Sequence, residues 1–203
     1  MFTWYFGFSF WMLSADLAIL TGILIFLNSF VSIHEDQVGV IVKRFSPGKS
    51  LPEGRVVALE GEAGYQARPL GPGVHFPFWP WQYKIEKHPI TRIEQGYVGL
   101  VIANDGDAMP TDRVLANVVD CEFFQDAAKF LRNGGQKGRQ STVLTAGFYR
   151  INPVLFKVIP NVPITKIDSD KIGIVTVMDG APMPVGQMAA KAAVGHDDFL
   201  LTD

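Results

Sequence analysis

The sequence has little of the chemistry that builds a catalytic or metal site. Its single cysteine, Cys121, excludes an intrachain disulfide and fits a reducing compartment. The flanking Asp120 and Glu122 would raise the pKa of this thiol, which predicts a passive side chain. The four histidines lack metal-ligand spacing, and neither a Gly-x-Ser-x-Gly elbow nor a paired-histidine zinc motif is present. We therefore expect no enzyme activity, no catalytic residue, no metal and no cofactor.

Charge is also scarce. The formal net charge is −2 and there is no dense Lys/Arg stripe, which argues against a nucleic-acid partner. The N-terminal segment from Met1 to Ile33 contains no Lys, Arg, His or Glu, and its one acidic residue is Asp16. From Leu13 to Ile33 the chain is predominantly apolar, and as a helix this stretch would span ~31 Å, about the thickness of a bilayer core. This pattern predicts a membrane anchor over residues 1–33 rather than a buried core helix.

The form of the anchor stays open between a single-pass helix and a hairpin with the aromatic-rich residues 1–11. A cleaved signal peptide is not favoured, because a positive n-region and a small-x-small site are both missing. Lys43, Arg44 and Lys49 follow the apolar segment, so the positive-inside bias predicts membrane localisation with a cytoplasmic body. The residues expected to contact lipid or equivalent helices of neighbouring copies are Leu13, Leu17, Leu20, Leu24, Ile25, Leu27 and Phe30.

A short pattern recurs along the rest of the chain. An isoleucine precedes a strand glycine by six positions three times, in the pairs Ile33 and Gly39, Ile93 and Gly99, and Ile167 and Gly173. A second signature contains Gly73 and then Gly147, and the interval between these two glycines equals the interval between Gly99 and Gly173. A fixed recurrence of one supersecondary unit predicts a modular array of small β units.

The predicted fold class is mainly β with an N-terminal membrane helix, tandem small β modules and one short helix. Short β-branched or aromatic segments between turn residues predict strands. Apolar residues at helical spacing before Gly134 predict a helix over 122–133. The predicted strands are 38–45, 56–59, 98–103, 114–119, 148–151, 155–159 and 172–178.

The repeat predicts a first β module over 34–90, a second over 91–163 that contains the helix, and a third over 164–203. The second copy runs from Gly99 to its closing Gly147, whereas the chain reaches Asp203 before the same interval after Gly173 is complete. The third module is therefore expected to be incomplete. An open strand edge is rarely tolerated at a terminus, so we expect this chain to be the N-terminal part of a longer protein.

The segment 75–81 is unusually aromatic for a turn. His75 is expected to make a structural hydrogen bond there. Two interpretations of the aromatic residues stay open: a strand end that fills the core, and a tip that enters the membrane interface, where Trp is favoured. The residues of this candidate tip are Phe76, Phe78, Trp79 and Trp81.

Two segments behind the apolar N-terminus carry a family resemblance. Residues 33–45 read Ile-His-Glu-Asp-Gln-Val-Gly-Val-Ile-Val-Lys-Arg-Phe, and residues 70–77 read Leu-Gly-Pro-Gly-Val-His-Phe-Pro. In this order the chain resembles the stomatin/prohibitin/flotillin group, the SPFH or Band 7 superfamily. The later residues 133–140 and 147–153 resemble its longer, flotillin-like bacterial members, which stack several such β units. The resemblance implies SPFH or vault-like β repeats and a non-enzymatic membrane scaffold that forms large rings or cages. The coiled coil typical of the family does not appear before Asp203.

The leading hypothesis is a membrane-anchored scaffold that oligomerises into a large ring or cage and organises a membrane microdomain. Its expected partners are the lipid bilayer, further copies of the chain and a membrane-protein client. The alternative is a regulatory subunit that encloses and restrains a membrane protease or another client complex. A membrane-tethered enzyme with unfamiliar active-site geometry is the third hypothesis.

Overall fold

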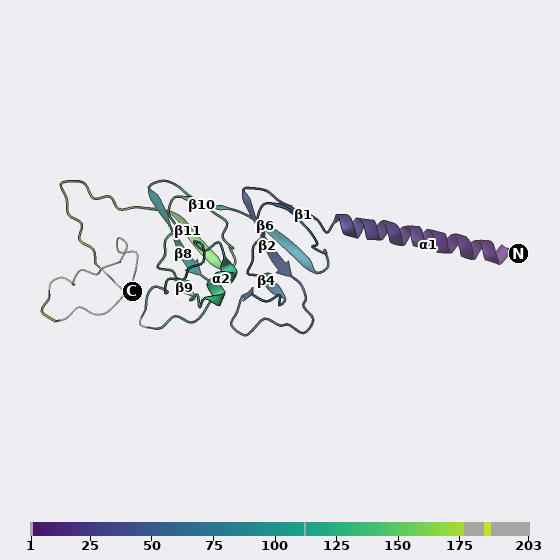
Figure 1. Cartoon of the computed structure of the whole chain (residues 1–203), viewed down its shortest axis with the longest axis horizontal. Helices are drawn as coiled ribbons and strands as arrows, with labels where there is room; N and C mark the ends of the chain where they lie inside the picture. The colour runs from purple at the N-terminus through teal and green to yellow at the C-terminus, as the bar shows by residue number, and fades with distance from the viewer. Residues whose placement is uncertain (1, 112, 177–184, 188–203) are drawn as a thin grey trace.

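The computed structural model describes residues 2–111, 113–176 and 185–187, with side chains described from Ser14 onward. A long helix, α1 (Phe2–Leu27), projects from one end of a β body (Figure 1). The strands nearest to α1 form a first module, residues 31–89, and the following strands with a short helix form a second module, residues 91–163 (Figure 1). The described chain is therefore mainly β and is built from several small sheets.

The predicted membrane anchor is wrong. Within the residues that the structure describes, no helix has both the length and the apolar character needed to cross a bilayer. The predicted span from Leu13 to Ile33 is also not one helix, because Asn28 Nδ2 donates to Leu24 O and Ser29 Oγ donates to Ile25 O where α1 ends. The N-terminal membrane helix of the predicted fold class and the predicted membrane localisation are corrected with it. The same correction applies to the anchor residues Leu13, Leu17, Leu20, Leu24, Ile25, Leu27 and Phe30.

The first module contains a four-stranded sheet in the order β3-β4-β2-β6 and a separate pair, β1 with β5. Strand β2 is antiparallel to both β4 and β6, whereas β3 runs parallel to β4. The strands are β1 (Val31–Ile33), β2 (Gln37–Lys43), β3 (Val57–Ala58), β4 (Gly64–Gln66), β5 (Gly73–His75) and β6 (Tyr83–Pro89).

The second module contains a three-stranded sheet in the order β11-β8-β9 and the pair β7 with β10. It also carries the short helix α2 (Ala127–Arg132), which the first module lacks. The strands are β7 (Thr91–Ile93), β8 (Tyr97–Ala103), β9 (Gly138–Arg139), β10 (Gly147–Tyr149) and β11 (Phe156–Pro163).

The two modules share one pairing register. Ile33 pairs with Gly73 between β1 and β5, and Ile93 pairs with Gly147 between β7 and β10. Bridges also recur, from Gly39 to Leu70 in the first module and from Gly99 to Leu144 in the second. The sequence repeat therefore corresponds to a repeat of strand pairing over residues 31–163.

The recurring strand glycine lies beneath the recurring isoleucine. A Cβ added at Gly39 would lie 3.0 Å from Ile33 Cδ1, and one added at Gly99 would lie 2.8 Å from Ile93 Cδ1. Both distances are too short for ordinary van der Waals contact. The glycine is thus required because the isoleucine side chain occupies the space in which any other side chain would begin.

Replacing Gly99 with alanine is expected to lower the free energy of unfolding by about 1–3 kcal/mol, because the new methyl group overpacks against Ile93. Urea denaturation followed by circular dichroism measures the change. Removing the clashing Cδ1 with Ile93→Val in the same chain should recover part of the loss. Gly71→Ala is the matched control, since no atom lies within 4 Å of its added Cβ. Equal effects of the two alanines would contradict this packing argument.

Several predicted elements differ from the structure. Segment 114–119 forms no strand and makes one isolated bridge, between Ala116 and Gln140. The described residues 172–176 of another predicted strand are also not a strand. Most of the predicted third module, residues 177–184 and 188–203, lies outside the described residues.

The predicted helix over 122–133 begins only at Ala127. Glu122, Phe123 and Phe124 have φ values of 54°, 53° and 64°, which place them in the left-handed region and outside any right-handed helix. Asp126 then caps α2, because its carboxylate accepts a hydrogen bond from Lys129 N at 2.9 Å.

The main core belongs to the second module but is completed by the first. Phe130 of α2 and Phe156 of β11 are fully buried, with ring centroids 4.9 Å apart in an edge-to-face arrangement. Val57 and Ala67 of the first module are buried in the same cluster. The first module therefore covers an apolar face of the second.

Candidate functional site at the module junction

His75 and Cys121, two of the side chains considered from the sequence, lie in structural surroundings. Among them, no group of three or more His, Cys, Asp or Glu side chains could hold a metal ion. The Nε2 of His75 lies 2.8 Å from Gly71 O, a hydrogen bond that stabilises the turn. Burial raises the pKa of the Cys121 thiol, which keeps it protonated at neutral pH.

The junction between the two modules is instead built on a buried carboxylate. Asp105, which follows β8, is 1% exposed. Its Oδ2 accepts hydrogen bonds from the backbone amides of Val56 at 2.7 Å and Val57 at 2.8 Å, at the start of β3. Its Oδ1 accepts a third bond, from Gly106 N at 2.7 Å. The second module thus supplies the acceptor for two backbone donors of the first.

A cation of the first module completes this contact. Arg55 Nη1 lies 3.6 Å from Asp105 Oδ1, and Arg55 Nη2 donates to Asp107 Oδ1 at 3.0 Å. A buried carboxylate needs such a partner, since an unpaired charge is costly to remove from water. Gly106 lets the turn fold here, because an added Cβ would collide with the Gly135 carbonyl oxygen.

A buried amide makes the second polar contact between the modules. The Asn152 side chain is fully buried, and its Nδ2 donates to Gln66 O at 3.1 Å and to Ala67 O at 3.2 Å in the first module. Its Oδ1 accepts from Val154 N at 3.0 Å within the second module. Both ends of the amide are therefore held at the junction, which fixes the orientation of the two modules.

The aromatic segment of the first module makes the corresponding contact with α1. Phe76 occupies the place in the first module that Arg150 occupies in the second, and Arg150 Nη2 reaches Glu35 O of the first module at 3.4 Å. The Phe76 ring lies 5.5 Å from Phe26 and 4.8 Å from Phe30, centroid to centroid. In each module, the segment after the short closing strand contacts the element that precedes the module.

The structure places the predicted aromatic tip beside the end of α1. Phe78 N donates to Ser29 O at 2.9 Å, which ties the segment to the end of α1. Phe76 and Trp81 are half-exposed, so these two rings do not fill the core. Trp79 stacks on Trp81, with centroids 5.2 Å apart. These rings form the joint between the helix and the β body.

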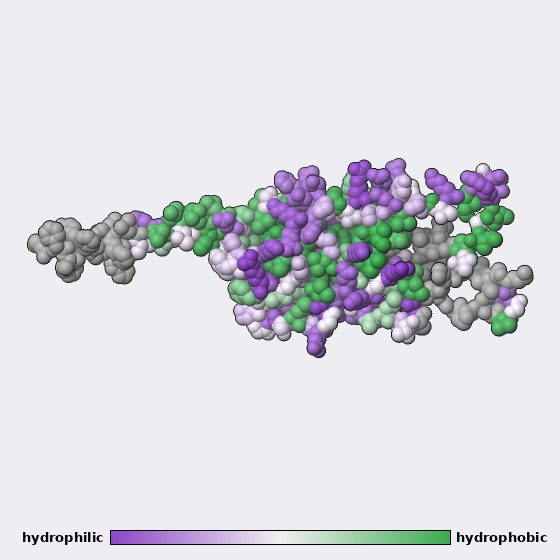
Figure 2. All heavy atoms as spheres, turned by 180° about the vertical axis from the view of Figure 1, so that it is seen from behind, coloured by the Kyte–Doolittle hydropathy of each residue, from purple (hydrophilic) through white to green (hydrophobic). Residues whose placement is uncertain are grey.

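Helix α1 is almost entirely exposed where its side chains are described. From residue 14 to residue 28, every residue except Ile25 is exposed. Among the large apolar side chains, the exposed fraction runs from 65% at Leu17 to 48% at Phe26. The apolar stretch stands clear of the body (Figure 2).

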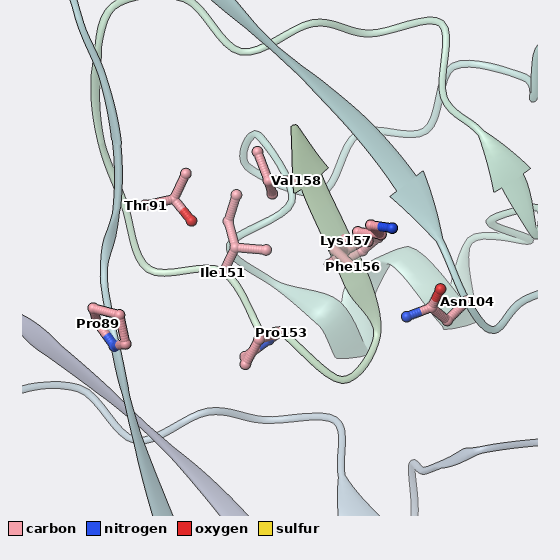
Figure 3. A pocket seen from close by; sticks show the side chains of 8 residues that line it. All are labelled: Pro89, Thr91, Asn104, Ile151, Pro153, Phe156, Lys157 and Val158. Atoms are coloured by element: carbon pink, nitrogen blue, oxygen red, sulfur yellow. The ribbon is translucent and has the colours of Figure 1, made fainter. Parts of the chain in front are cut away.

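An open cavity of about 380 Å³ lies beside the link between the modules (Figure 3). Pro89 and Thr91 line one side, and Asn104 and Lys157 lie across from them. The lining contains one charged side chain and lacks a nucleophile paired with a base. This cavity therefore gives no reason to assign a reaction.

The fold and the junction define a tandem β-module protein. No protein-family model, curated protein or solved structure matches the chain. The resemblance to the SPFH group stays a prediction from the quoted sequence segments.

The sequence predicted a turn at Asp105 but missed its role at the junction. A usable signal was present. Asp105-Gly106 recurs in the third copy as Asp179-Gly180, whereas the corresponding residues of the first copy, which follows α1, are Phe45-Ser46. An Asp-Gly pair that occurs only in copies preceded by another copy indicates an inter-module contact. Asn152 offered no such signal, because the chain contains no later counterpart.

Proposed function

We propose that this protein is a non-enzymatic scaffold that assembles into a ring or cage through its N-terminal helices, with the β modules as a rigid spacer. The exposed apolar surface of α1 is the observation that carries the proposal. The resemblance to ring-forming SPFH proteins supports the same function. The proposal concerns association between copies of the chain and assigns no reaction to it.

Burial of the apolar surface of α1 would be strongly favourable. Full burial of one Leu or Ile side chain stabilises by about 1.5–3 kcal/mol, so several exposed on one helix favour association strongly. A helix with such a surface is usually buried in an assembly or core. Among the described side chains, the body contacts the helix at its base, through the ring of Phe76.

The occupant that we assign is α1 of another copy. At about 100° per residue, Leu17, Leu20 and Leu24 lie on one side of the helix, and Ala18 and Gly22 lie on the other. No atom lies within 4 Å of a Cβ added at Gly22. Large side chains of one helix can therefore pack against the small-residue side of the next, in a head-to-tail manner that closes into a ring.

The rigid junction suits the spacer role. The two modules share a buried carboxylate, a buried amide and part of one core, so they are expected to move as one body. In an assembly joined through α1, such a spacer would keep the ring of helices at a fixed distance from the far end of each β body.

The double variant Leu20→Glu/Leu24→Glu tests the proposal. Two carboxylates on the leucine side of α1 should abolish assembly, giving a monomer near the chain mass of 22.4 kDa in sedimentation velocity. The native chain should sediment as a discrete multi-copy species. Val74→Glu is the control, because Val74 is an apolar residue of β5 that is 70% exposed, and it should assemble normally. A monomeric native chain, or normal assembly of the double variant, would refute the proposal.

A further inference from the structure

The second module repeats the surface on which the first module holds the second. Ala58 pairs in parallel with Gln66, and Ala116 pairs in parallel with Gln140. This register aligns residues 55–57 with residues 113–115, so that Arg55 corresponds to Arg113. The second module therefore carries an arginine followed by two backbone amides at the place where the first module binds Asp105.

The turn beside this surface is also repeated. Gln66 Nε2 donates to Glu62 O at 2.8 Å and to Gly64 O at 3.0 Å. Its counterpart in the second module makes the same two bonds with the same lengths, from Gln140 Nε2 to Gln136 O and Gly138 O. Ala67, whose carbonyl accepts from Asn152, corresponds in this register to Ser141. The two surfaces thus present their backbone groups in the same arrangement.

The burial of the two surfaces differs. Val57 is 2% exposed beneath the second module, and the side chain of its counterpart Leu115 is only partly buried. Val114 is 47% exposed, much as its counterpart Val56 is at 45%. The difference between the two surfaces therefore lies at Leu115, which a further module would bury as the second module buries Val57.

The chain after the second module begins like a third copy. In all three copies, the backbone amide of the residue two positions before the strand glycine donates to the carbonyl three residues earlier. These bonds are Gln37 N to His34 O at 3.1 Å, Tyr97 N to Glu94 O at 3.2 Å and Lys171 N to Asp168 O at 3.0 Å. Ile167 also lies over Gly173, since a Cβ added there would collide with Ile167 Cδ1.

The third copy has exposed apolar residues and an aspartate at the positions that docking requires. Ile172 and Ile174 are 94% and 93% exposed, whereas their counterparts Val38 and Val40 in the first module are 1% and 0% exposed. Asp179 follows Gly173 by six residues, as Asp105 follows Gly99. Residues 177–184 lie outside the described residues, so the place of Asp179 comes from the sequence interval.

We propose that segment 164–203 docks on residues 113–116 and 140–141 of the second module as a third repeat. Its Asp179 carboxylate accepts hydrogen bonds from the backbone amides of Val114 and Leu115 and pairs with Arg113. The third repeat would thus bind the second module through the same type of contact by which the second module binds the first. This docking does not depend on assembly through α1.

Hydrogen–deuterium exchange resolved to single amides in the full chain tests the docking. In the native protein the amides of Val114 and Leu115 should be protected, as those of Val56 and Val57 are expected to be. Asp179→Ala should speed exchange at Val114 and Leu115 at least tenfold and leave Val56 and Val57 unchanged, which also shows that the modules remain folded. Asp198→Ala, in the same segment, is the matched control and should change none of these amides.

A second variant separates docking from general loosening of the segment. Arg113→Ala removes the cation from the second module and should speed exchange at the same two amides without touching segment 164–203 itself. Sedimentation of Asp179→Ala should be native, so failure of docking and failure of α1 assembly are distinguishable. Fast exchange at Val114 and Leu115 in the native chain, or unchanged exchange in Asp179→Ala, would overturn the proposal.

Discussion

Replacing Asp105 with alanine should lower the free energy of unfolding by about 3 kcal/mol or more. The carboxylate accepts three backbone hydrogen bonds and is 1% exposed, so its removal leaves the amides of Val56 and Val57 buried without an acceptor. Arg55 loses its buried partner at the same time. Chemical denaturation followed by circular dichroism measures the change.

Asp107→Ala is the matched control for this prediction. Asp107 contacts the same arginine, but its side chain is 55% exposed, and an exposed ion pair contributes at most about 1 kcal/mol. Asp105→Asn should fall between the two alanine variants, because one oxygen acceptor remains while the other is replaced by an amide donor. Equal losses in Asp105→Ala and Asp107→Ala would show that the buried hydrogen bonds do not stabilise the junction.

Replacing Phe130 with alanine should cost about 3–5 kcal/mol, the range for removing a fully buried aromatic ring. Phe130 is 0% exposed, and its ring makes an edge contact with Phe156 and a tilted contact with Phe124. Gly135, in the loop after α2, packs directly against this ring, since a Cβ added there would lie 2.5 Å from Phe130 Cε1. Removing the ring therefore leaves a cavity beside this loop. Urea denaturation gives the loss.

Phe148→Ala is the control for the core, because Phe148 is a strand phenylalanine that is 65% exposed. It should cost no more than about 1 kcal/mol, from the lost contact with Arg92. Phe130→Leu should recover part of the loss, since it refills some of the cavity. If truncation at Phe130 and at Phe148 destabilised the protein equally, this cluster would not be the core of the second module.

Both variants should also unfold in a single transition that includes the first module. Val57 and Ala67 belong to the core cluster of the second module, and Asp105 and Asn152 bind backbone groups of the first. Modules joined in this way lose stability together, as neighbouring units of a repeat array do. We therefore expect the two modules of the described chain to behave as one cooperative unit built from two copies of a pattern.

The elements that the sequence predicted well are those with local causes. Strands β2 and β8 coincide closely with the predicted segments 38–45 and 98–103, because β-branched runs bounded by turn residues specify an extended chain. The predicted strand at 114–119 failed because partner strands decide which extended segments join a sheet. The predicted helix start at 122 failed because Phe124 reaches the core through a left-handed turn.

The N-terminal segment shows the limit of hydropathy. Its apolar composition predicted one span through Ile33, but Asn28 and Ser29 bond back to the last turn, and Val31–Ile33 then pairs with β5. Hydropathy counts apolar residues and does not register where side chains end a helix. The partner strand, Gly73–His75, lies far along the chain, beyond the reach of a window average.

The sequence by itself determined the repeat, because an isoleucine that must lie over a glycine six residues later leaves a pattern that recurs with each copy. Only the tertiary structure decided which residues join the copies. Asp105 binds an amide 49 positions away and Asn152 a carbonyl 86 positions away. A carboxylate or amide becomes decisive only when folding removes it from water, since burial then requires a partner for every polar atom. That requirement arises from the packing of one module on another, and no local pattern of residues encodes it.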